Sequence, residues 1–154
     1  MDYSRLFAIS AAGMAAERTR VEVAALNLAN ANTVAGPDGG AFAPQRVVTR
    51  SVALAGPGAG NFGAHLARVL DQQDAPAVFV PEAVVQGTGA PPRSLYEPGH
   101  PMASASGFVM QPGVDTATEM VTVMSAMRAY EANVAVANAA RSLALKTLEI
   151  GGGS

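Results

Sequence analysis

The sequence has 154 residues, enough for one modest domain with terminal arms, and carries a formal net charge of −2. This charge excludes a broad phosphate-binding surface, so nucleic acid is not an expected partner. The absence of cysteine excludes disulfides and thiolate metal sites, and an aromatic content of 5% leaves few large side chains for a thick core.

The sequence argues against both a cleaved signal peptide and a membrane-spanning segment. The N-terminus is a poor signal peptide, because Asp2 offsets the charge of Arg5 and the following run is rich in small residues. Charged residues also interrupt the longest apolar runs of the C-terminal third: Glu119, Arg128, Glu131 and Arg141. We predict a chain that has no cleaved signal sequence and does not span a membrane.

The first element predicted is one long amphipathic helix from residue 2 to about 33, a segment that lacks proline. One apolar line recurs every seven positions, and three alanines are expected on the same side: Phe7, Met14, Val21 and Leu28, with Ala11, Ala24 and Ala25. A second line is offset from the first: Leu6, Ile9, Ala16 and Val23. A helix with two apolar sides should have two neighbours.

Short polar residues are expected at both ends of this helix. Asp2 or Ser4 can cap its start, and weak helix formers followed by Gly36 and Pro37 should end it near Thr33. The weak formers include three asparagines: Asn27, Asn30 and Asn32. Two interpretations of the asparagines remain open, namely ordinary helix-end residues or hydrogen-bonding groups at a contact between subunits.

The middle of the chain, residues 35–113, holds nearly all the prolines and predicts turns and short strands. The candidate strands are 45–54, 65–71, 77–80 and 108–110. Residues 58–63 fit the dinucleotide pattern G-x-G-x-x-G, but no useful helix follows before Pro76 and repeated βαβ units are missing. We therefore assign no cofactor to this loop.

The last element predicted is a helix that begins at a capping box of Thr116 and Glu119 and runs without proline to Gly151. At about 1.5 Å per residue it is roughly 50 Å long. It carries two apolar lines of seven-residue period: Met120, Met127, Val134 and Leu148, and Val136, Leu143 and Ile150.

These elements predict an α+β fold. The N-terminal helix region (1–34) and the C-terminal helix region (114–150) should pair as a coiled-coil-like hairpin, with a small β-containing middle region (35–113) and a flexible tail (151–154). The remaining apolar stripes would then contact neighbouring subunits.

Residues that could suggest chemistry have simpler explanations. Helical spacing predicts packing, and not soft-metal binding, for Met120, Met124 and Met127. His100 lies between Gly99 and Pro101, which is typical of a rigid turn. We assign no catalytic, cofactor or metal residue, and an enzyme is the least supported class.

Polar residues within the second helix are candidates for fixing the alignment of subunits. A solvated face is the alternative, but a buried polar group without its partner costs about 1–3 kcal/mol, so it discriminates alignments better than an apolar stripe does. The candidate interface set is Phe7, Met14, Val21, Leu28, Asn27, Asn30, Asn32, Met120, Met127, Arg128, Tyr130, Glu131, Asn133, Val134 and Leu148.

Short motifs in both helices carry a resemblance: SAAGM at 10–14, NLANANT at 27–33 and RAYEAN at 128–133. With these motifs the chain resembles the bacterial flagellar rod and hook axial protein family. Further segments resemble the C-type proximal rod proteins of that family: YEPGHP at 96–101, GFV at 107–109, PGVD at 112–115 and EMV at 119–121.

The resemblance implies a structural subunit of the flagellar basal-body rod that assembles through its terminal helices, transmits torque and lines the export channel. Expected partners are copies of itself, other proximal and distal rod proteins, the rod-to-ring adaptor and the export apparatus, with no small-molecule substrate. Such a subunit is exported by the type III apparatus without a cleaved signal and polymerises in the periplasm. The alternative is a secreted helical adaptor or needle-like protein that binds a different partner.

Overall fold

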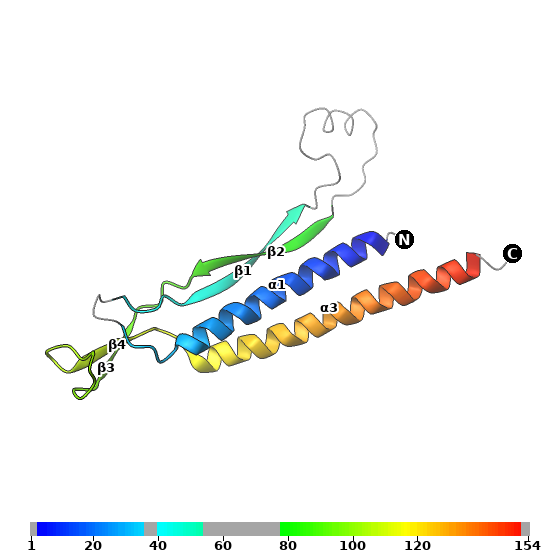
Figure 1. Ribbon diagram of the computed structural model, residues 1–154. Coiled ribbons are helices and arrows are strands. Elements are labelled where there is room, and N and C mark those ends of the chain that lie inside the picture. The colour runs from blue at the N-terminus through cyan, green and yellow to red at the C-terminus, as the bar shows by residue number, and fades with distance from the viewer. Residues whose placement is uncertain (1–2, 36–39, 54–77, 152–154) are drawn as a thin grey trace, which may run out of the picture.

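The computed structural model describes residues 3–35, 40–53 and 78–151. Two long helices, α1 (Tyr3–Asn30) and α3 (Thr116–Gly151), lie side by side and run in opposite directions (Figure 1). An antiparallel ribbon of β1 (Gln45–Ala53) and β2 (Phe79–Gly87) packs along α1. The α+β prediction and the pairing of the two helices are confirmed, and α1 has the two neighbours that its two apolar sides predict.

Small side chains line the seam between α1 and α3. Ser10 and Ala24 of α1 and Ala126 and Ala140 of α3 are buried there. Small residues let two helix backbones approach closely, so the seam is packed without large side chains between the helices. At Gly13 the approach is so close that a Cβ atom would lie 2.8 Å from Asn133 Oδ1.

The seam keeps one register over two heptads. Gly13 faces Asn133, and Asn27 donates a hydrogen bond to Glu119 at 2.8 Å. The members of both pairs are fourteen residues apart along their own helices. The seven-residue spacing of the sequence is therefore reflected in the helix pairing, but small residues occupy the contact line and the large ones lie beside it.

The ribbon of β1 and β2 pairs from Gln45 opposite Gly87 to Ala53 opposite Phe79. Thr88 N–H donates to the Pro44 carbonyl at 2.8 Å, which sets the alternation of hydrogen-bonded pairs. Pro81 then falls at a position whose N–H would point to the outer edge, where proline is tolerated. The predicted strand 77–80 is therefore too short, because β2 continues through Pro81.

A second small sheet, β3 (Arg93–Tyr96) with β4 (Phe108–Gln111), lies where α1 ends and α3 begins (Figure 1). Strand β4 matches the predicted strand 108–110. Strand β3 was not predicted, because it has four exposed residues and follows two prolines, which leaves no apolar alternation. The predicted strand 65–71 and the glycine loop 58–63 lie outside the described residues.

A segment of successive turns, residues 97–107, joins β3 to β4. Met102 N–H donates to His100 Nδ1 at 3.1 Å, so His100 has the turn role predicted for it. Gly107 has a φ of 78°, a conformation that glycine adopts without strain. The rings of Tyr96 and Phe108 pack edge to face at 5.2 Å.

Helix α1 ends at Asn30, whose carbonyl accepts both the backbone N–H and the hydroxyl of Thr33. This end is close to the predicted one. The chain then bonds to the second sheet, since Ala35 N–H donates to the Met110 carbonyl at 2.8 Å. The proposed cap Asp2 lies outside the described residues.

Helix α3 begins at Thr116 as predicted, but its cap is Asp115. The Asp115 carboxylate accepts hydrogen bonds from Thr118 Oγ1 at 2.6 Å and Ala117 N–H at 3.1 Å, and these bonds lower its pKa, the Thr118 bond more strongly. The capping box of Thr116 and Glu119 is wrong. Glu119 instead accepts a hydrogen bond from α1, because the helix pairing brings Asn27 within reach.

Candidate subunit interface

Most large apolar side chains of α3 are exposed and are not buried against α1. Met120 is 58% exposed, Met127 52%, Leu148 71% and Ile150 84%. Val136 and Leu143 of the second predicted line are also exposed, whereas Val134 is half-buried. Neither described helix has a segment long and apolar enough to cross a bilayer. Exposed apolar stripes of this extent mark surfaces that bind other proteins.

The first predicted line of α1 lies on the flank of the seam. Phe7 is exposed, and Met14, Val21 and Leu28 are half-buried. The alanines expected on the same side separate, because Ala24 is buried while Ala11 and Ala25 are exposed. The alanines therefore differ in burial although the sequence grouped them, because the pairing with α3 decides which small residues become buried.

The apolar lines of the two helices meet in one groove of about 490 Å³. Val21 of α1 and Met127 and Tyr130 of α3 line this groove, and its polar rim consists of Arg18, Glu22 and Glu131. We call this groove with its rim the α1–α3 face. It places four of the predicted interface residues on one surface, although they come from opposite ends of the chain: Val21, Met127, Tyr130 and Glu131.

Sequence reasoning missed the charged pair on this face. Arg18 Nε donates to Glu22 Oε1 at 2.8 Å, and the pair is exposed. The Glu22 carboxylate raises the pKa of Arg18, first through the hydrogen bond and then through its charge. The spacing of four residues between opposite charges on a helix was the signal available in the sequence.

The structure separates the three predicted asparagines of α1. Asn27 is 0% exposed and makes all its hydrogen bonds inside the chain, to Gln45 and Glu119. Asn30 donates to the Leu26 carbonyl, one turn earlier, and Asn32 is exposed beyond the helix end. Asn27 is thus placed among the packed elements, and only Asn32 is freely presented to a neighbour.

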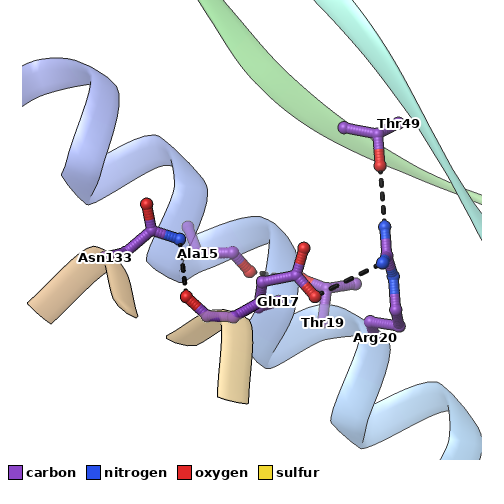
Figure 2. Close-up of polar contacts among 7 residues, drawn as sticks. Ala15, Glu17, Thr19, Arg20, Thr49 and Asn133 are labelled. Carbon is purple, nitrogen blue, oxygen red and sulfur yellow. Dashed lines mark hydrogen bonds and ion pairs between the residues drawn. The ribbon is translucent and has the colours of Figure 1, made fainter. Parts of the chain in front are cut away.

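The polar residues of the α3 motif at 128–133 also lie in two different environments. Arg128 and Glu131 are exposed, and Tyr130 is partly so. Asn133 is half-buried, donates to the Ala129 carbonyl at 3.0 Å and lies against Gly13. Figure 2 shows Asn133 on α3 beside the ribbon of α1. Asn133 thus belongs to the seam, and the other three to the outer surface.

A second polar group links α1 to the ribbon. Arg20 donates to Thr49 Oγ1 at 2.9 Å and lies 3.4 Å from Glu17 Oε2 (Figure 2). The Glu17 side chain is only 14% exposed, and its Oε2 makes no hydrogen bond. The ion pair with Arg20 therefore supplies its compensation. No sequence pattern singled out this group, because Thr49 is distant along the chain.

Comparisons with known proteins identify the class. A family model described as "Flagella basal body rod protein" matches residues 7–37, which include most of α1. A second model, "Flagellar basal body rod FlgEFG protein C-terminal", matches residues 105–150, which include β4 and most of α3. Both helices that build the α1–α3 face thus match proteins of the flagellar rod.

Full-length relatives narrow the class further. The flagellar basal-body rod protein FlgC of Escherichia coli O6:H1 is 41% identical over 95% of this chain and 96% of the relative. FlgC of Salmonella typhimurium is 40% identical with the same coverage, and FlgC of Bacillus subtilis is 33% identical over 93% of this chain and 94% of the relative. The chain belongs to the FlgC family of flagellar basal-body rod proteins and is a structural subunit of the rod.

Proposed function

We propose that this chain builds the proximal rod by packing its α1–α3 face against copies of itself and against other rod proteins. The observation that carries the proposal is the groove in which Val21, Met127 and Tyr130 from both terminal helices meet. Helix α1 already pairs with α3 through small residues, so these large side chains are available to a neighbour. Burying them removes apolar surface from water at about 25 cal/mol per Å².

The polar rim of the face would align the subunits. Apolar stripes tolerate sliding, whereas a buried charged or polar group must meet its partner. In our proposal Glu131 of the rim and the exposed Arg128 of the same helix supply contacts that fix the register, and Asn32 adds contacts beyond the end of α1. A fixed register suits a rod that must transmit torque without slipping between subunits.

Assembly would also cover exposed apolar residues at the end of α3. In our proposal the exposed residues at the end of α3, Leu148 and Ile150, pack against neighbours and contribute to the wall of the export channel. We further propose export without a cleaved signal, assembly in the periplasm, and contacts with distal rod proteins, the rod-to-ring adaptor and the export apparatus. We propose no enzymatic activity for the subunit.

The proposal is tested by placing charge in the groove. Val21→Glu and Met127→Glu, alone and together, should block incorporation of a tagged chain into purified basal bodies and abolish swimming. Both side chains lie beside the seam, so the isolated variant should keep the helix content of the parent by circular dichroism. Met102→Glu is the matched control, because Met102 is also apolar and exposed but lies between β3 and β4, outside the α1–α3 face.

Normal rods in the double variant would contradict the role of this face. A tagged parent chain that stays soluble in cells with intact basal bodies would contradict the assembly proposal itself. That second result would favour a secreted adaptor.

A further inference from the structure

The buried amide of Asn27 occupies the edge of strand β1. Asn27 Nδ2 donates to the Gln45 carbonyl at 2.6 Å, and Gln45 N–H donates to Asn27 Oδ1 at 3.0 Å. The strand alternation turns both backbone groups of Gln45 away from β2. The side chain of Asn27 therefore makes the two backbone hydrogen bonds to Gln45 that a further strand would make.

The same amide also bonds to helix α3. The Nδ2 group also donates to Glu119 Oε1 at 2.8 Å, so both of its N–H groups and its oxygen are used. Glu119 lies in the first turn of α3, 92 residues further along the chain. Asn27 is 0% exposed, so water cannot replace a lost partner.

Within the described part of the chain, α1 packs on α3, β1 and β2, but α3 does not pack on the ribbon. The rest of the contact between α1 and the ribbon is weakly specific. It includes small apolar side chains such as Ala16 and Val23, which line grooves shared with the ribbon, and the exposed bond from Arg20 to Thr49. Apolar contacts of this kind tolerate sliding, and exposed polar bonds contribute little.

We propose that Asn27 is a positioning residue that couples docking of the β1–β2 ribbon to pairing of the two helices. Opening either contact leaves buried polar groups of the shared amide without partners. The ribbon and the start of α3 therefore dock and separate together. The angle at which the ribbon projects from the helix pair, and hence its position toward neighbouring subunits, is set at this one side chain.

Amide hydrogen exchange on the full chain measures how often the ribbon contact and the helix pairing each open. The reporters are Gln45 N–H for the ribbon and the Ala126 N–H for the α1–α3 seam. Asn27→Asp keeps the shape but loses both donors and places a second carboxylate beside Glu119. Exchange at both reporters should rise by about ten- to a hundredfold, the cost of unpaired buried groups. Asn30→Asp is the matched control, because its exposed amide bonds only within α1.

A double variant distinguishes coupling between the two contacts from damage that Asn27→Asp causes at each contact separately. Glu119→Gln added to Asn27→Asp restores a donor and acceptor pair between the helices but does not touch Gln45. Coupling predicts that exchange slows again at both reporters, and by similar factors. Rescue confined to Ala126 would overturn the proposal, as would fast exchange at Gln45 in the parent chain.

A milder variant protects the test against loss of folding. Glu119→Ala removes only the hydrogen bond between Asn27 and α3, and Glu149→Ala is its control at an exposed residue of the same helix. Faster exchange at Gln45 in Glu119→Ala, with no change in Glu149→Ala, supports the coupling. An unchanged Gln45 in Glu119→Ala contradicts it, whether or not the chain assembles into rods.

Discussion

Gly113 lies where the segment after β4 passes beside the prolines that precede β3. A Cβ atom at Gly113 would fall on the carbonyl oxygen of Pro91 and within 3.2 Å of Ala90 Cβ. Its φ is not in the left-handed region, so the requirement is steric. Backbone atoms have little freedom to move aside, which makes this contact less forgiving than the one between Gly13 and the Asn133 side chain.

We expect Gly113→Ala to destabilise the chain by about 1–3 kcal/mol, the usual cost of overpacking. The measurement is urea unfolding followed by tyrosine fluorescence, since Tyr96 lies in the adjoining sheet. Gly87→Ala is the control, because a Cβ atom there meets nothing within 4 Å. Equal stability of the two variants would contradict the prediction, because it would show that the Pro91 segment can move aside.

At the scale of elements, the start of α3 depends on Asp115. Hydrogen bonds from the Thr118 hydroxyl and the Ala117 N–H favour the charged carboxylate and lower its pKa. A negative charge before the first turn also complements the helix dipole. The cap therefore stabilises the helix while Asp115 is ionised.

The lowered pKa gives this stabilisation a pH dependence. It is fully present above the unfolded pKa of Asp, about 3.9, and is lost as the pH falls through the lower pKa of the folded chain. In a titration from about pH 6 to pH 2, Asp115→Ala should be less stable than the parent at the upper end, and the difference should shrink toward the lower end.

Asp115→Asn distinguishes charge from hydrogen bonding. Its amide oxygen can still accept the Ala117 N–H bond, so the variant should retain part of the cap at every pH. A stability difference between parent and Asp115→Ala that does not change with pH would contradict an ionised cap.

At the scale of the whole molecule, the chain has more apolar surface than its own contacts cover. Among residues 3–35, 40–53 and 78–151 the fully buried side chains are few and small, and Val109 and Val114 are among the largest of them. Much of the apolar surface of both helices stays exposed in the single subunit. A protein of this design gains much of its stability when subunits associate.

Glu131→Ala tests whether polar residues of the α1–α3 face set the alignment of subunits. Glu131 is exposed, so the substitution should leave thermal unfolding of the free chain unchanged. Incorporation into basal bodies and swimming speed should both fall, because the register contact is lost without opening a cavity. Glu97→Ala, on an exposed residue outside the helices, should behave as the parent. Rods of normal number and normal swimming would rule out this role for Glu131.

Local pattern was sufficient for much of the fold. The absence of proline and the recurrence of apolar residues located both helices to within a few residues of their ends, and short apolar runs located β1 and β4. Two apolar sides on α1 correctly implied two neighbours. The motifs at 27–33 and 128–133 were sufficient for the family, because the comparisons match those same helices.

Contacts between distant residues were decided only in three dimensions. The sequence offered several apolar sides on each helix, and close approach at Gly13, Ala24 and Ala126 selected the seam and left the methionines outside. The hydrogen-bond partners of Asn27 could likewise not be predicted, because they are 18 and 92 residues away along the chain. Helix periodicity is a property of neighbouring residues, whereas the choice of partner depends on how well two surfaces fit, and that fit exists only once the chain has folded.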